Sequence, residues 1–295
     1  MLRFAPRPNG PLHLGHALSL FANETMATCL GLPLMLRMED IDRARARPEF
    51  EAAILDDMAF LGVRWSPPLR RQSDRFSLYA GALEQLQQMG LVYPSFATRK
   101  EIAAACPPGS PRDPDGALHF PGDEQILPAA ELERRRRSEA PAAWRLAMGP
   151  ALAVALVDGP LTARRVDATG AIDGTLTLEP AAWGDVVLAR KDTPTSYHLS
   201  VVVDDAEQGI RHVVRGADLE ASPAVHRLLQ ALLKLPVPHY HHHRLVLGDD
   251  GRKLAKSNGA ESLGALRQAG MSAADIRRRL GYGGTPQRAD LLKEG

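Results

Sequence analysis

The sequence predicts an α/β fold: a parallel sheet with crossover helices, an inserted α+β subdomain and a short helical C-terminal segment. Residues 2–92 alternate short apolar strands with helical stretches, which implies a parallel sheet with right-handed crossovers. Prolines and polar residues then dominate, and buried-strand texture returns after Asp185. We therefore expect four segments, in which the first and third build one domain: 1–92, 93–184, 185–235 and 236–295.

The elements of the first segment follow from apolar periodicity and turn residues. A strand at Leu2–Ala5 ends in a Pro/Gly-rich turn, and a helix at Leu14–Leu30 and a strand at Pro33–Met38 follow. Two more helices each end before a glycine, which is typical of a helix C-terminus. We expect these helices at Pro48–Leu61 and Phe76–Met89.

The later elements are less regular, because prolines interrupt residues 107–121. We expect a charged helix at Pro128–Ser138. Short strands are predicted at Ala153–Val157, Thr175–Leu178, Asp185–Leu188, Tyr197–Val203 and Arg244–Leu247. The histidine-rich run His239–His243 is interpreted as the edge of a loop rather than as a tag or metal-binding tract.

Composition excludes several classes of protein. The net charge of the 295 residues is +1, whereas non-specific nucleic-acid binding usually needs a far more basic chain. A basic surface would have to be local, and three runs are candidates, although such runs are also common on solvated helix faces: Arg134–Arg137, Arg277–Arg279, and Arg43, Arg45 and Arg47. Two cysteines fit a reducing cytosol, and without a signal peptide or a long apolar span we expect a cytoplasmic protein.

The first candidate site directly follows the first strand, in the segment Pro8–His16. His13 and His16 are three residues apart at a helix start, so both side chains project to one side. The helix N-terminus favours phosphate, and Gly15 leaves room for a base or ribose. The two imidazoles can then donate to phosphate oxygens during substitution at phosphorus. The alternative is a pair of polar residues that only begin a helix.

The second candidate site is the glycine-flanked loop Gly251–Ser257. Lys253 and Lys256 are three residues apart, and their ammonium groups suit a pyrophosphate leaving group without demanding one fixed geometry. Taken alone, such a loop is equally well explained as solvated surface.

Together, HLGH and KLAKS resemble the HIGH and KMSKS signatures of class I aminoacyl-tRNA synthetases. Four further stretches, in the same order, resemble the glutamyl-tRNA synthetase branch: Arg3–Pro6, Leu36–Asp42, Tyr197–Asp205 and Val214–Leu219. The resemblance implies a Rossmann-like class I synthetase fold and the use of ATP with Mg²⁺. It implies catalytic roles for His13, His16, Lys253 and Lys256, and ATP binding by Pro6, Gly15, His16 and Lys256. Ala255 replaces a serine of the signature, but both lysines are kept.

The resemblance also implies a glutamate pocket. Arg3 and Arg215 match arginines that pair with substrate carboxylates, Glu39 matches the group that faces the ammonium, and Tyr197 matches a wall tyrosine. Ala5 and Arg7 complete the expected set, although Arg7 stands where the branch usually has serine. Two guanidiniums and one carboxylate complement a glutamate. The alternative is that Arg3 and Arg215 form structural ion pairs with Glu39 or Asp40.

Length favours a short form of the branch, since only 38 residues follow Ser257 in the chain of 295. The short form resembles enzymes that place glutamate on queuosine in the anticodon of tRNA(Asp). The expected partners are L-glutamate, ATP and the anticodon stem-loop of tRNA(Asp), and a monomer without membrane contact is expected. Two alternatives stay open: a truncated glutamyl-tRNA synthetase charging the 3′ end of tRNA(Glu), or a non-catalytic relative that binds tRNA or glutamate.

Short-form members commonly carry a zinc site in the inserted subdomain, and this chain departs from that pattern. Ser95, Ala97 and Phe120 stand where ligands are expected, and Glu124 alone cannot make a tetrahedral site. Cys106 is isolated between the two segments. We therefore predict that no zinc is bound.

Overall fold

The computed structural model describes residues 1–138, 140–248, 254 and 261–283. It begins with a three-stranded parallel sheet of order β1-β2-β3, in which Arg3 lies opposite Met35. Helices α1 and α2 connect the strands as crossovers, because a parallel pair cannot be joined by a tight turn. The elements are β1 (Leu2–Phe4), α1 (Leu14–Leu30), β2 (Leu34–Met38), α2 (Pro48–Phe60) and β3 (Ser66–Arg71).

A four-stranded sheet of order β7-β6-β10-β9 lies beside β1. Strand β10 is parallel to both β6 and β9, and the backbone N–H of Arg211 donates to the Met1 carbonyl at 3.0 Å. This bond links the start of β9 to the start of β1. The elements are β6 (Thr162–Val166), β7 (Ile172–Thr177), α8 (Tyr197–Glu207), β9 (His212–Gly216), η3 (Ala217–Leu219), α9 (Pro223–Leu232) and β10 (His239–His243).

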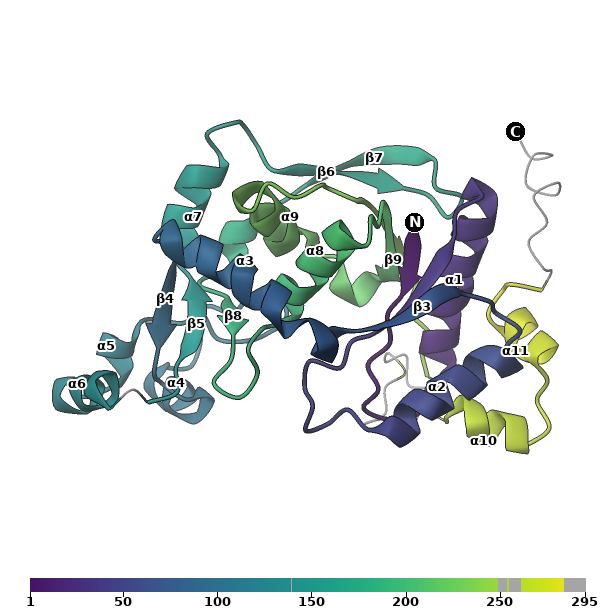
Figure 1. Cartoon of the computed structure of the whole chain (residues 1–295), viewed down its shortest axis with the longest axis horizontal. Helices are drawn as coiled ribbons and strands as arrows, with labels where there is room; N and C mark the ends of the chain where they lie inside the picture. Colours follow the sequence, from purple (N-terminus) through teal and green to yellow (C-terminus); the bar gives the residue numbers. More distant parts are fainter. Residues whose placement is uncertain (139, 249–253, 255–260, 284–295) are drawn as a thin grey trace.

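A lobe around the antiparallel sheet β4-β5-β8 extends from this body (Figure 1). Helices α4, α5 and α6 form its tip, while α3 lies between the lobe sheet and α8, and α7 packs beside α9. The elements are η1 (Gln72–Arg75), α3 (Phe76–Gln88), β4 (Val92–Ser95), α4 (Arg99–Ala105), α5 (Asp123–Ile126), α6 (Ala129–Arg137), β5 (Ala143–Leu146), α7 (Met148–Ala155), η2 (Pro180–Trp183) and β8 (Val187–Ala189).

The last described helices, α10 (Leu263–Gln268) and α11 (Ala273–Arg279), pack on α1. Leu263, Leu266 and Ile276 are buried in the same core cluster as Phe21. The C-terminal segment therefore covers part of the surface of α1. It lies at the opposite end of the molecule from the lobe (Figure 1). Among the described helices, none has both the length and the apolar content needed to cross a bilayer.

The α/β class was predicted correctly, and the five predicted elements of the first segment have ends that differ by one residue or less from the structure. Strand β3 was not predicted, because its two prolines and two arginines do not form an apolar strand pattern. Three later predictions were wrong. Tyr197–Val203 is the start of helix α8, where Ser196 caps the helix by accepting from the Leu199 N–H. Ala153–Val157 overlaps helix α7 rather than a strand. The strand near the end of the sheet is the histidine run His239–His243, not Arg244–Leu247.

Candidate active site

The two histidines of the HLGH segment build the N-terminus of α1. His13 is the N-cap residue, and its Nδ1 accepts from the Gly15 N–H at 3.1 Å. His16 Nδ1 accepts from the His13 N–H, also at 3.1 Å, and the ring centroids lie 3.9 Å apart. Since each Nδ1 accepts a hydrogen bond, the neutral rings carry their proton on Nε2. A Cβ at Gly15 would come within 2.9 Å of the His13 ring, so glycine is needed there by the cap itself.

The two lysines of the KLAKS segment, Lys253 and Lys256, lie outside the described residues. Their described neighbours are fixed to the body. Leu254 donates its N–H to the Val246 carbonyl at 2.9 Å and packs against the α1 core cluster. Ser262 forms a β-bridge with His13, and the Leu263 N–H donates to the Leu12 carbonyl at 2.8 Å. The chain beyond this loop therefore returns to the start of α1.

Arg3 belongs to a buried cluster of compensated charges. Its Nε donates to Asp205 Oδ1 at 3.0 Å, and Arg37 Nη2 donates to the same oxygen at 2.8 Å. Arg37 is fully buried and also lies 3.8 Å from carboxylate oxygens of Asp204 and Glu39. Burial alone would raise the pKa of Asp205, but the two guanidiniums hold it below its usual value. Arg3 thus has an ion-pair partner that the sequence analysis did not consider.

Arg215 on β9 is buried, and its hydrogen-bond partners are neutral groups, although its charge also acts on Asp115. Its Nε donates to His242 Nε2 at 3.2 Å, and its Nη1 donates to the Tyr197 hydroxyl at 3.3 Å. The Nη1 also lies 3.5 Å from His226 Nδ1. Arg215 forms no ion pair with a carboxylate of the described chain, and its buried Nη2 has no hydrogen-bond partner. A buried guanidinium in this state is suited to receive an anion.

The histidines around Arg215 are held neutral. Burial is the main cause, and the Arg215 charge adds to it, so the pKa falls to about 4 for His198 and to about 3 for His242. The same two causes, in the same order, place the pKa of His226 well below its usual value. His226 Nε2 lies 3.2 Å from His198 Nδ1, which continues the contact from Arg215.

Glu39, Arg7 and Tyr197 meet at the edge of this cluster. The Glu39 N–H donates to the Pro6 carbonyl at 3.0 Å, which places the Glu39 carboxylate beside Arg7. Ala5, which precedes Pro6, is half-buried. Arg7 Nε lies 3.7 Å from Glu39 Oε2, and its guanidinium lies 5.0 Å from the Tyr197 ring centre. Burial raises the pKa of Glu39 although three arginines oppose this effect.

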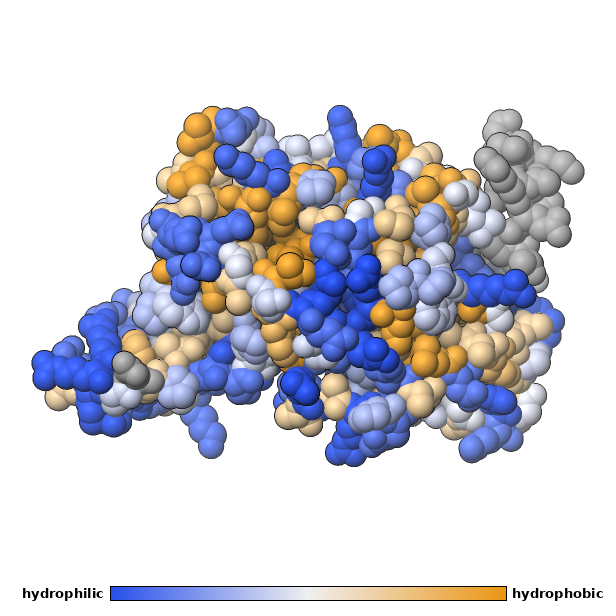
Figure 2. Space-filling model, viewed as in Figure 1, coloured by the Kyte–Doolittle hydropathy of each residue, from blue (hydrophilic) through white to orange (hydrophobic). Residues whose placement is uncertain are grey.

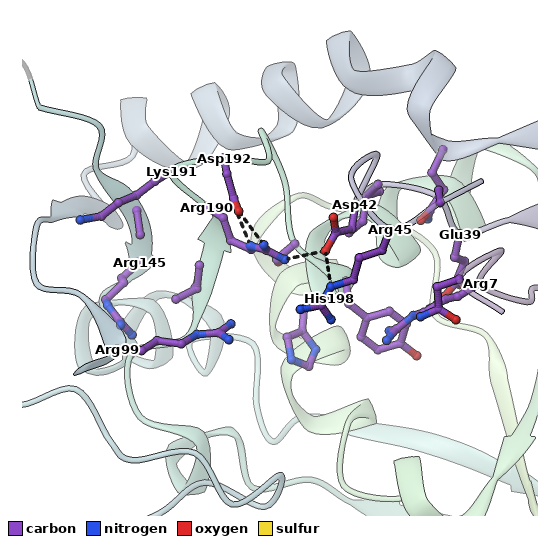
Figure 3. A pocket seen from close by; sticks show the side chains of 18 of the residues that line it. Arg7, Glu39, Asp42, Arg45, Arg99, Arg145, Arg190, Lys191, Asp192 and His198 are labelled. Atoms are coloured by element: carbon purple, nitrogen blue, oxygen red, sulfur yellow. Dashed lines mark hydrogen bonds and ion pairs between the residues drawn. The ribbon is translucent and has the colours of Figure 1, made fainter. Parts of the chain in front are cut away.

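A pocket of about 690 Å³ runs from these residues toward the lobe. Figure 3 shows Arg7 and Glu39 at one end and Arg99, Arg145 and Lys191 at the other. Between them, Asp42 lies 3.7 Å from both Arg45 and Arg190, which joins the two walls. His198 and Tyr197 also line the pocket, whereas His13, His16, Arg3 and Arg215 do not.

The candidate basic runs differ in how their charges are used. On α6, every arginine of Arg134–Arg137 pairs with a glutamate, so the hydrophilic tip of the lobe in Figure 2 carries compensated charge. In the Arg277–Arg279 run, Arg277 pairs with Glu24 and Arg278 with Asp275. In the third run, Arg45 lines the pocket itself.

The positions where zinc ligands were considered contain other contacts. Arg145 Nε donates to Ser95 Oγ at 3.0 Å, and the Arg145 guanidinium lies 4.0 Å from the Phe120 ring centre. The Asp123 carboxylate accepts from the N–H groups of Phe96 and Ala97 at 2.7 and 2.8 Å. Within the described ranges, no group of three or more His, Cys, Asp or Glu residues is placed to hold a metal ion. The absence of zinc stays a prediction.

The sequence analysis missed several residues of this site. No role was predicted for Arg37 or Asp205, although they lie in the stretches Leu36–Asp42 and Tyr197–Asp205. The histidines that surround Arg215 were also overlooked. These histidines come from α8, α9 and β10, so no local spacing connects them. The one signal available in the sequence was the unusual number of histidines near strand β9, which carries Arg215.

Comparison with known proteins places this site in a family. Residues 1–290 match the model of the tRNA synthetases class I (E and Q), catalytic domain. A glutamyl-Q tRNA(Asp) synthetase of Rhodobacter capsulatus is 47% identical over 95% of this chain and 99% of the relative. A protein of the same name from Symbiobacterium thermophilum is 37% identical over 95% of this chain and 85% of its own length.

A solved structure shows the same arrangement in a longer protein. The glutamate-tRNA synthetase of Elizabethkingia anophelis superposes with a TM-score of 0.66 at 26% identity. The match covers 88% of this chain and 52% of that one, so this chain spans about half of the longer protein.

Proposed function

Because this chain belongs to the class I tRNA synthetases (E and Q), we propose that it activates L-glutamate with ATP and transfers the glutamyl group to queuosine in the anticodon of tRNA(Asp). The enzyme is then a glutamyl-tRNA-type ligase. Two relatives named glutamyl-Q tRNA(Asp) synthetase, which this chain covers over 99% and 85% of their length, support this choice.

The observation that carries the proposal is the state of Arg215. Its guanidinium is buried, faces neutral partners and keeps one Nη2 without a hydrogen bond. A carboxylate of glutamate would complete this group, while the nearby Glu39 would receive the substrate ammonium. The proposed pocket is completed by Arg3, Ala5, Arg7 and Tyr197. In this pocket Arg3 is already ion-paired with Asp205.

In the proposed first step, an α-carboxylate oxygen of glutamate attacks the α-phosphorus of ATP and pyrophosphate leaves. The carboxylate is already ionised, so catalysis needs positioning and charge stabilisation rather than a general base. His13 and His16 at the start of α1 would donate to phosphate oxygens, with Pro6 and Gly15 lining the nucleotide, and Lys253 and Lys256 would follow the departing charge. Mg²⁺ neutralises the polyphosphate when bound, and proteins commonly hold it through substrate phosphates.

In the second step, a hydroxyl of the acceptor attacks the carbonyl carbon of the mixed anhydride, its proton is lost and AMP leaves. We propose that the acceptor is a hydroxyl of queuosine. The enzyme works as a monomer in the cytoplasm in this proposal.

Locating the label after a single incubation tests the proposal. Labelled glutamate, ATP and tRNA from queuosine-containing cells should give label in the anticodon loop of tRNA(Asp), and tRNA from queuosine-deficient cells should give none. Label at the 3′ end of tRNA(Glu) would instead identify a truncated glutamyl-tRNA synthetase. If ATP–pyrophosphate exchange with glutamate is absent, the non-catalytic alternative holds.

A further inference from the structure

The pocket carries more positive charge than its ion pairs account for. Six cationic and three anionic side chains line it. The anionic groups all lie at one end or in the middle: Glu39 near Arg7, and Asp42 and Asp192 beside Arg190. The cations at the lobe end form no ion pair with a carboxylate in the described part of the chain: Arg99, Arg145 and Lys191.

The hydrogen bonds that hold Arg145 and Lys191 go to neutral acceptors. Arg145 donates to Ser95 Oγ and, at 2.8 Å, to the Asp185 carbonyl, and Lys191 Nζ donates to the Phe96 carbonyl at 2.6 Å. Burial lowers the pKa of both groups, and for Lys191 the nearby Arg135 lowers it further. Arg99 is exposed at the first turn of α4. Asp123 partly opposes the effect of burial on both Arg145 and Lys191, but it forms no ion pair with either of them. Both side chains are therefore held by neutral acceptors and remain cationic ligands for an anion.

We propose that this lobe end of the pocket binds the phosphodiester backbone of the acceptor RNA loop, next to the nucleoside that receives the glutamyl group. The inference rests on the proposed function, which places glutamate at the Arg7 and Glu39 end. The acceptor hydroxyl must reach the activated carboxyl group there, so the RNA backbone next to the acceptor nucleoside would pass the lobe end of the pocket. Each phosphodiester carries one negative charge, and arginine and lysine are its usual partners.

The polyphosphate of ATP is the other source of phosphate, and the geometry favours the RNA. The proposed nucleotide site lies at the start of α1, and neither His13 nor His16 lines this pocket. Asp42 and Arg190 lie between the two ends and connect the body to the lobe. The lobe end is therefore the outer part of a site whose inner part takes the amino acid.

Direct binding of tRNA tests the inference. The dissociation constant of the full chain for queuosine-containing tRNA(Asp) is measured at several salt concentrations, for the unchanged protein and for Arg99→Glu, Arg99→Lys and Arg279→Glu. Arg99 is the residue to change because it is exposed, and glutamate is favourable at a helix N-terminus, so the fold should be kept. Arg279 is also exposed and without an ion pair among the described residues, but it lies on α11 at the far end of the molecule (Figure 1).

We expect Arg99→Glu to weaken binding by about tenfold or more and to reduce the slope of log K against log salt by about 1. Arg99→Lys should stay within about threefold of the unchanged protein, and Arg279→Glu should match it. Equal weakening by both charge reversals, or no effect of Arg99→Glu, overturns the inference. Displacement of the RNA by millimolar pyrophosphate from the unchanged protein but not from Arg99→Glu also overturns it. Since the readout is binding, a failure of glutamate activation would refute the proposed function and leave this result standing.

Discussion

Two buried arginines lie near each other in this protein in opposite electrostatic surroundings. Arg37 is enclosed by Asp204, Asp205 and Glu39, and these carboxylates raise its pKa although burial alone would lower it. Arg215 is enclosed by Tyr197, His226 and His242 and has no carboxylate partner in the described chain. Removing one partner of a buried ion pair strands the other charge and destabilises the fold, whereas a buried guanidinium without a carboxylate partner remains available for a ligand.

Replacing Arg37 should lower the stability of the folded protein. Arg37→Met leaves Asp204 and Asp205 buried with less compensation, so the free energy of unfolding should fall by about 3–5 kcal/mol. Urea denaturation of the purified protein measures the change. Asp205→Asn in the same chain should recover part of the loss, since it removes one of the stranded charges. A variant as stable as the unchanged protein would remove the distinction between the two arginines.

Replacing Arg215 should instead weaken the use of glutamate as a substrate. Arg215→Ala removes the proposed carboxylate partner, so kcat/KM for glutamate in ATP–pyrophosphate exchange should fall roughly 10²–10³-fold. The free energy of unfolding should not decrease, because the guanidinium has no buried carboxylate to strand. Arg211→Ala, an exposed change just before β9, is the matched control. Loss of stability with unchanged kcat/KM would reverse the assignment.

Lowering the pH should reduce the stability of the protein through the histidines that surround Arg215. A histidine whose pKa is lower in the folded than in the unfolded chain binds fewer protons when folded. Its contribution is therefore complete above pH about 6.5 and is lost as the pH falls toward about 4, the folded value for His198. Between pH 6.5 and 5.5 each such histidine should cost roughly 1 kcal/mol.

The variant His226→Gln isolates one of these histidines, because glutamine keeps a polar side chain that does not titrate. Its free energy of unfolding should fall by roughly 1 kcal/mol less than that of the unchanged protein over the same pH interval. Chemical denaturation at the two pH values gives the comparison. Parallel losses in both proteins would show that His226 does not take up a proton on unfolding.

Arg7 should give the smallest effect. Its side chain is 56% exposed, and its 3.7 Å ion pair with Glu39 is of the kind that contributes about 0–1 kcal/mol. Arg7→Ser restores the residue usual in the branch, and KM for glutamate should change by no more than about fivefold. A larger rise in KM, with unchanged kcat, would give Arg7 a direct contact with the substrate.

The sequence was sufficient for most elements of the first segment, but not for β3, and it was insufficient where tertiary contacts decide. Apolar periodicity predicts α1 over the same residues as the structure. Helix α8 contains three consecutive valines and reads as a strand, because β-branched residues are typical of strands and the run is short. The run His239–His243 reads as a loop, yet its pairing with both β6 and β9 makes it a central strand.

Residues that belong to a motif could be proposed for the site from the sequence. Arg215, Glu39 and Tyr197 were found through resemblance, and the structure brings Glu39, Arg7 and Tyr197 together at the pocket. The pairing of Arg3 with Asp205 and the neutral surroundings of Arg215 depend on side chains from separate elements. No spacing along the chain reports such contacts, so only the three-dimensional structure reveals which arginine is compensated.

The Asp123 carboxylate has a consequence for how the lobe can vary. It joins Phe96 and Ala97 to a residue 26 or more positions later and so fixes the strand end that leads to Arg99. The cost of closing such a loop rises by only about 0.6 kcal/mol when its length doubles. Residues 106–122, which do not line the pocket, can therefore be added or deleted during evolution, or by engineering, while the wall around Arg99 keeps its position.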